Sequence, residues 1–228
     1  MKNKGEKFAY IPIFCNLNGK SVVVIGGGNV AERKIRGLLK AGAQVTLISP
    51  ETTDSLGKMV QEGLIRHISR AFRPGDLDGA WLVIAATSDR SVQDAVFQEA
   101  QARRIFCNVV DEPRVCSFIV PSMVRRDELC LAISTGGLSP ALAKALRKEF
   151  EKRLGPEWGT FVSLLGKLRN LLLQNHQGKA VTDRCSRLAD LDVPEWIKQN
   201  QWSRVEKWAS DICGEQAKTI VQEFARDG

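Results

Sequence analysis

Residues 22–34 read VVVIGGGNVAERK, an apolar run followed by three glycines and then by a segment with helical character. Ser21–Ile25 has the β-branched, uncharged composition of a strand that is covered on both faces. Gly26 allows a tight turn, Gly28 lets backbone N–H groups approach a phosphate, and the small Ala31 lets the helix pack on the strand. This G-x-G-x-x-A spacing predicts the strand, turn and helix of a dinucleotide-binding site.

The segment after the glycines supports the same interpretation. A helix over residues 29–41 points its positive end at a bound phosphate, and a second strand follows over residues 45–48. The acidic residue that usually ends this strand, to contact the ribose, is missing. Ser49 or Glu51 can contact a ribose instead. No arginine follows at once to bind a 2′-phosphate, which favours NAD over NADP. The alternative is a glycine turn that only needs positive φ. The predicted cofactor-binding residues are Gly26, Gly28, Asn29, Val30, Ala31, Ser49, Pro50, Glu51 and Thr87.

Composition limits the function classes. The chain has 228 residues, a net charge of +7 and six cysteines without a C-x-x-C pair, so we expect reduced thiols and neither a zinc site nor a disulfide framework. No nucleic-acid-reading motif accompanies the basic residues, and we expect no nucleic-acid partner. No signal peptide or membrane-spanning stretch is evident, which predicts a cytoplasmic protein with no membrane partner. We expect no metal role for His67, which we predict to be exposed, or for His176.

Strands and helices alternate up to about residue 113. A short strand is predicted over residues 64–69, apolar or covered strands over 81–86 and 105–110, and helices over 52–62 and 91–103. This order predicts an α/β fold with a Rossmann-like, doubly wound parallel sheet. Because ligands bind at the carboxyl ends of such strands, we expect Thr87, Asn108 and Asp111 to lie at one edge of the sheet.

The pattern changes after residue 113. Residues 117–124 and 129–135 are strand-like and are joined by a polar hairpin connection at residues 125–128. Two strands alone are marginally stable, so a partner subunit is a reasonable neighbour. Ser139 and Pro140 then predict a helix start, and a helix at 157–175 and a helical tail follow. The predicted domains are a nucleotide-binding domain at 1–113, a dimerisation region at 114–155 and a helical domain at 156–228.

Six segments in order carry a family resemblance: IPIF at 11–14, VIGGGNVAERK at 24–34, IAATSD at 84–89, IFCNVVDEP at 105–113, SFIVPS at 117–122 and AISTGGLSPALA at 132–143. Together they resemble precorrin-2 dehydrogenase, the N-terminal module of siroheme synthases. The resemblance implies NAD-dependent oxidation of precorrin-2 to sirohydrochlorin by a homodimer, and some members also insert ferrous iron. Since no methyltransferase module follows, we expect a standalone dehydrogenase.

Few residues are expected to take part directly in the chemistry of the reaction. Asp111 follows the last parallel strand and matches the family's acidic position, so we predict that it is the catalytic base; a turn aspartate is the alternative. Arg125, Arg126, Lys144 and Arg147 are candidates for the carboxylates of the substrate. Two alternative functions remain open: a bifunctional dehydrogenase and ferrochelatase, or an NAD-sensing regulatory module. Covalent modification of Ser134 or Thr135 also remains open. The predicted substrate-binding residues are Asn108, Ser134, Thr135, Gly136 and Ser139.

Overall fold

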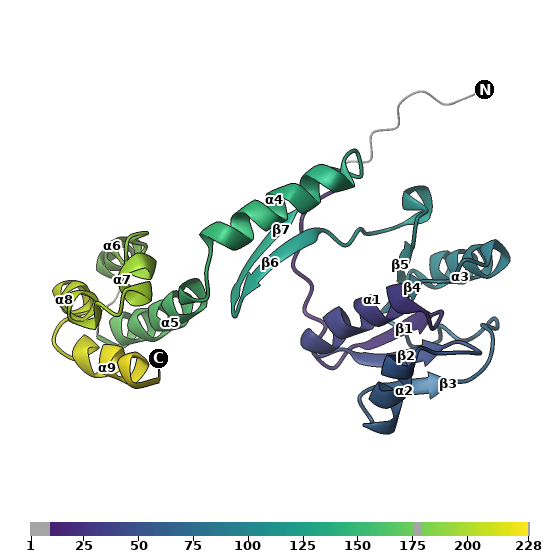
Figure 1. The fold of residues 1–228 in the computed structure, drawn as a ribbon, viewed down its shortest axis with the longest axis horizontal. Coiled ribbons are helices and arrows are strands. Elements are labelled where there is room, and N and C mark those ends of the chain that lie inside the picture. The colour runs from purple at the N-terminus through teal and green to yellow at the C-terminus, as the bar shows by residue number, and fades with distance from the viewer. Residues whose placement is uncertain (1–9, 176–178, 228) are drawn as a thin grey trace. The chain divides into compact units, whose positions relative to one another are not determined.

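The computed structural model describes residues 10–175 and 179–227, and the chain divides into two compact units, residues 1–120 and 121–228 (Figure 1). The first unit holds a five-stranded sheet in the order β3-β2-β1-β4-β5 in which all neighbours are parallel. The predicted Rossmann-like fold is confirmed. Its strands are β1 (Ser21–Ile25), β2 (Gln44–Ile48), β3 (Arg66–Ile68), β4 (Leu82–Ala85) and β5 (Phe106–Val109).

Both faces of this sheet are covered, as the apolar strands require. Val22 and Val24 point into a cluster with α1 (Asn29–Lys40) and α2 (Asp54–Gln61), whereas Val23 and Ile25 point into a second cluster that includes α3 (Arg90–Arg103). Successive side chains of a strand alternate between faces, so one uncharged run supplies both cores.

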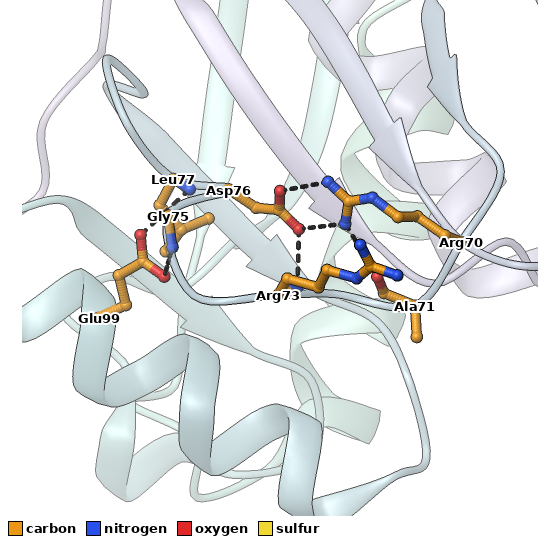
Figure 2. Close-up of polar contacts among 7 residues, drawn as sticks. All are labelled: Arg70, Ala71, Arg73, Gly75, Asp76, Leu77 and Glu99. Atoms are coloured by element: carbon orange, nitrogen blue, oxygen red, sulfur yellow. Dashed lines mark hydrogen bonds and ion pairs between the residues drawn. The ribbon is translucent and has the colours of Figure 1, made fainter.

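The loop that joins β3 to β4 takes the place of a helix, and carboxylates hold its backbone (Figure 2). Arg70 donates two hydrogen bonds of 2.7 Å to the Asp76 carboxylate, which also accepts the Arg73 backbone N–H. From α3, Glu99 accepts the N–H groups of Gly75 and Leu77 at 3.0 and 3.3 Å. These contacts satisfy loop donors that no strand or helix pairs. The Arg70 guanidinium lowers the pKa of the Asp76 carboxyl.

The strand predicted at residues 117–124 is corrected by the structure. Ser117 donates its backbone N–H to the Cys107 carbonyl at 2.9 Å, and the Phe118 carbonyl accepts from Asn108 at 3.0 Å. These residues dock on β5, so β6 begins only at Ser122. The hairpin consists of β6 (Ser122–Arg126) and β7 (Leu129–Ile133), with Asp127 at a positive φ of 49° in the turn.

The second unit adds helices to this hairpin. α4 (Pro140–Arg153) packs on β6, and Ser139 caps it by accepting the Leu142 N–H at 3.2 Å, as predicted. Trp202 and Trp208 pack against the helical core. After the break that follows α6, Pro194 lies in the first turn of the next helix, a position where proline fits a helix start. The remaining helices are α5 (Glu157–Asn175), α6 (Lys179–Arg187), α7 (Val193–Lys198), α8 (Trp202–Cys213) and α9 (Ala217–Asp227).

Candidate nucleotide site and the segment after the last strand

The strand order brings the predicted site segments of the first unit to one edge. Ile25 lies beside both Ile48 and Ala85, and Ala85 lies beside Val109, so these four strands end at one level. The strand order in the sheet reverses between β1 and β4, and parallel sheets of this type bind ligands at such a point. The residues that follow the four ends include Gly26, Gly28, Ser49, Pro50, Glu51, Thr87 and Asp111.

The three glycines of the loop after β1 have different constraints. Gly26 has a φ of +103°, and a Cβ there would lie 2.8 Å from the carbonyl carbon of Ala86. A Cβ on Gly27 would overlap the Glu51 carbonyl oxygen and lie 2.8 Å from the Ser49 hydroxyl. A Cβ on Gly28 would meet no atom within 4 Å. The first two glycines therefore serve packing within the protein, while Gly28 faces open space.

Gly27 is a residue that the sequence reasoning missed. The spacing G-x-G-x-x-A treats its position as variable, yet its carbonyl also accepts the Thr53 N–H at 3.0 Å. This bond and the close approach of Glu51 join the loop after β1 to the loop after β2. The sequence contains a sign of this role: Gly26, Gly27 and Gly28 are consecutive, whereas the G-x-G spacing requires glycine at only two of these positions.

The start of α1 has no side-chain cap, unlike the starts of α2, α3 and α4. Thr53, Asp89 and Ser139 accept backbone N–H groups at the starts of α2, α3 and α4, whereas Gly28 provides no side-chain cap for α1. The first N–H groups of α1 are thus open to an anion, and the helix dipole favours one there. Asn29 is exposed, and Ala31 is fully buried in the core.

The segment after β2 is tied internally. The Ser49 side chain is 7% exposed, and its hydroxyl donates to the Glu51 carbonyl at 2.7 Å. The His67 ring lies 2.9 Å from the Ser49 carbonyl oxygen. His67 is half-buried, so the prediction that it is exposed is wrong; its strand neighbours β2 and its ring reaches that backbone. His176 lies outside the described residues. Glu51 is exposed at this edge, and its role at the ribose stays a prediction.

On the other side of the edge, polar side chains hold the chain that follows β5. Asn108 is 8% exposed, and its amide donates to Phe118, as above. The Cys116 sulfur lies 3.2 Å from both the N and the O of Val109, and burial raises the pKa of its thiol. Thr87 accepts the Asp89 N–H at 3.2 Å. These contacts fix the backbone on either side of Asp111, and the role of Asn108 in substrate binding stays a prediction.

Asp111 itself is exposed and has a φ of +66°. In the described part of the chain, no hydrogen bond or ion pair holds its carboxylate, whereas its neighbour Glu112 pairs with Arg90 at 2.8 Å. A positive φ outside glycine costs free energy and is often found at functional sites. The carboxylate is therefore available to a ligand at the edge of the sheet.

The remaining predicted substrate residues form a hydroxyl-rich turn in the second unit, between β7 and α4. Ser134 accepts the Gly136 N–H at 3.1 Å, and Thr135 accepts the Ser139 N–H at 3.0 Å. Gly136 has a φ of +61°. Each hydroxyl that accepts such a bond keeps its own proton free to donate to a carboxylate.

The four cations predicted for substrate carboxylates divide into two pairs. Arg126 donates to the carbonyls of Leu154 and Glu151 at 2.6 and 3.0 Å, and Arg147 forms an ion pair with Glu151. Arg125 and Lys144 are exposed, and in the described part of the chain neither forms an ion pair. The second pair is therefore better suited to an external anion.

Metal-binding and membrane-spanning features are both absent from the described residues. No group of three or more His, Cys, Asp or Glu side chains in residues 10–175 and 179–227 is arranged to hold a metal ion. None of the helices in the same ranges combines the length and the apolar content that crossing a membrane requires.

Comparisons with known proteins give two family matches and close relatives. Residues 13–122 match the family described as putative NAD(P)-binding, and residues 126–153 match the sirohaem biosynthesis protein central family. The chain is 47% identical over 160 residues to siroheme synthase 3 of Aeromonas hydrophila and 47% identical over 164 residues to siroheme synthase of Methylobacillus flagellatus. These alignments cover 70% and 72% of this chain but only 34% and 35% of the relatives, so it spans about a third of their length.

A solved structure shares the fold. SirC, precorrin-2 dehydrogenase, matches with a TM-score of 0.73 over 87% of this chain and 100% of its own, at 24% sequence identity. This likeness shows a shared fold. The family match, separately, gives residues 13–122 as similar to NAD(P)-binding domains, and the siroheme synthase relatives support the resemblance that the six motifs indicate.

Proposed function

We propose that this chain, a member of the siroheme synthase family over the residues that match, is an NAD-dependent dehydrogenase that oxidises precorrin-2 to sirohydrochlorin. The observation that carries the proposal is that the strands preceding Gly28, the uncapped start of α1 and Asp111 all end at one level of the sheet. The identity to siroheme synthases supports the choice of substrate.

The residues divide the work of a dehydrogenation. NAD bound at this edge would supply the hydride acceptor, and the electron pair of the broken C–H bond would leave the substrate with the hydride. The substrate also loses a proton, and Asp111 accepts it on a carboxylate oxygen. The first N–H groups of α1 hold the pyrophosphate. The exposed Glu51 carboxylate would repel a 2′-phosphate, which favours NAD over NADP.

The test is NADH formation with enzymatically generated precorrin-2. We expect Asp111→Asn to lower kcat by about 100-fold, because a positioned base contributes about that much, while NAD affinity stays within about twofold. Glu112→Gln is the matched control, since its carboxylate is already paired with Arg90, and it should keep most of the activity. Well-folded protein that forms no NADH would contradict the proposal, as would full activity in Asp111→Asn.

We also propose that the enzyme is a cytoplasmic homodimer that forms through α4. Leu142, Leu146 and Phe150 are spaced four residues apart along one side of this helix, and each is at least 36% exposed. Leu138, in the turn before the helix, is 93% exposed. A row of exposed apolar side chains beside a two-stranded sheet is typical of an interface. The free state of all six cysteines is consistent with a reducing compartment.

Sedimentation velocity tests the dimer. We expect the double variant Leu142→Glu/Leu146→Glu to sediment as a monomer, because charge replaces the apolar row. Leu191→Glu changes an exposed leucine outside α4 and should remain dimeric. Equal sedimentation of both variants would refute this interface.

A further inference from the structure

Thr53 lies between the segment after β2 and the start of α2, and each of its polar groups is hydrogen-bonded. Its backbone N–H donates to the Gly27 carbonyl at 3.0 Å, and its hydroxyl donates to Glu32 Oε2 at 3.0 Å. The hydroxyl oxygen accepts the Leu56 N–H at 3.3 Å as the N-cap of α2, and the Thr53 carbonyl accepts the Gly57 N–H at 2.9 Å. Thr53 therefore connects three elements: the loop after β1, α1 and α2.

Glu32 is held in place for this contact by a second partner. Arg36, one turn further along α1, donates two hydrogen bonds to Glu32 Oε1 at 2.8 and 3.1 Å, and a third to the Ser55 hydroxyl at 2.6 Å. Hydrogen bonding, first from Arg36 and then from Ser55 and Thr53, lowers the pKa of the Glu32 carboxyl. Ionised and bonded through both oxygens, the carboxylate is a well-oriented acceptor for the Thr53 hydroxyl.

The two loops that Thr53 joins each carry half of the proposed nucleotide site. Gly28 and the open N–H groups at the start of α1 belong to the pyrophosphate half, and Glu51 belongs to the ribose half. The backbone between the halves is closely packed, since a Cβ on Gly27 would overlap the Glu51 carbonyl oxygen, to which the Ser49 hydroxyl donates at 2.7 Å. A dinucleotide contacts both halves at once, so its affinity depends on their spacing.

We propose that Thr53 is a positioning residue for the dinucleotide: its bonds to Gly27 and Glu32 fix the spacing between the pyrophosphate half and the ribose half of the site. The inference rests on the proposed function for the use of NAD, but not for the choice of substrate. A helix cap alone would need only the bond to Leu56. The other two bonds, which reach the loop after β1 and α1, are the ones that this role requires.

One substitution separates the helix cap from the positioning role. Thr53→Asp keeps an oxygen that can cap α2, but it places a carboxylate where the hydroxyl donates to Glu32, so that two negative charges face each other. We expect the Kd for NAD, measured by calorimetric titration without substrate, to rise about tenfold. In the ligand-free protein, the N–H of residue 53 should exchange with solvent faster, because its bond to Gly27 is weakened, while the Leu56 N–H stays protected.

A second substitution should restore the lost contact. In the double variant Thr53→Asp/Glu32→Gln, the glutamine amide can donate to the new carboxylate, its oxygen can still accept from Arg36, and the net charge equals that of the wild type. We expect the Kd for NAD to return to within about threefold of the wild-type value. Thr53→Ser keeps both the donor and the cap and should also match the wild type. An unchanged Kd in Thr53→Asp would overturn the inference, as would a double variant that binds NAD no better than Thr53→Asp.

Turnover distinguishes the role of Thr53 from a general loss of structure and from the proposed function. With precorrin-2, Thr53→Asp should raise KM for NAD about tenfold and leave kcat within about twofold, since Asp111 follows a different strand. A fall in kcat with an unchanged KM would refute the positioning role. If the wild-type protein binds NAD but forms no NADH, the proposed function fails, and the titrations still decide the role of Thr53.

Discussion

Both units of the chain bury apolar residues, but they differ in which groups they leave exposed. The first unit covers both faces of its sheet and exposes backbone groups at one edge, around Gly28 and the start of α1. The second unit buries one row of α5, including Leu164, Leu168 and Leu172, yet leaves a leucine row of α4 in solvent. Open backbone donors suit a small anionic ligand, whereas open leucines suit another protein surface.

The largest expected effect on stability and binding comes from substituting Gly27 and Gly28, which are adjacent in the sequence but lie in different surroundings. Gly27→Ala should destabilise the first unit by about 4 kcal/mol or more, because its Cβ overlaps the Glu51 backbone. Gly28→Ala should leave stability within about 0.5 kcal/mol but weaken NAD binding at least about tenfold, since only a ligand would meet its methyl group. Hydrogen exchange and NAD titration measure the two quantities. Equal stability of both variants would break the distinction.

The helical core provides the next effect. Leu168 is fully buried, and Leu168→Ala should destabilise the second unit by about 3 kcal/mol through the cavity left behind. Leu173→Ala, at a half-exposed position of the same helix, should change stability by less than about 0.5 kcal/mol. Four of the five tryptophans lie in the second unit, so their fluorescence in urea reports its unfolding. Similar midpoints for the two variants would contradict the assigned core.

The loop between β3 and β4 gives a pH-dependent effect in the first unit. Because Arg70 lowers the folded pKa of Asp76, its ionised form stabilises the loop fully above about pH 5, and this contribution disappears as pH falls through the folded pKa. Asp76→Asn should cost about 1–2 kcal/mol at neutral pH and nothing in strong acid. Hydrogen exchange of residues 70–80 measures it. Asp78→Asn is the control, since that ion pair is exposed. A cost independent of pH would disprove the assignment.

The smallest effect tests whether Ser139 does more than cap α4. Ser139→Ala should cost about 1 kcal/mol, the usual price of a lost cap. Ser139→Asp keeps a capping oxygen but adds a negative charge, so it should preserve stability and raise KM for the carboxylate-bearing substrate several-fold. An unchanged KM in Ser139→Asp would reduce Ser139 to a helix cap.

Local patterns predicted much of both units. The glycine loop, the covered strands and Ser139 with Pro140 each depend on neighbouring residues, and the structure has them where predicted. The predicted start of the strand at residue 117 was wrong, because Ser117 and Phe118 bind β5, and β6 begins at Ser122. No local sequence pattern reports such a contact between separate segments. The exposure of His67 was wrong for a similar reason, since its partner Ser49 lies 18 residues away.

The sequence by itself determined the parallel sheet, the common edge at which its strands end and the position of Asp111 after the last strand, because strand composition and turn residues act over short distances. Only the tertiary structure decided that Gly27 is crowded by the Glu51 backbone and that Glu112 pairs with Arg90. Packing between distant segments sets these features, and the free energy of a charge depends on which groups the fold brings around it.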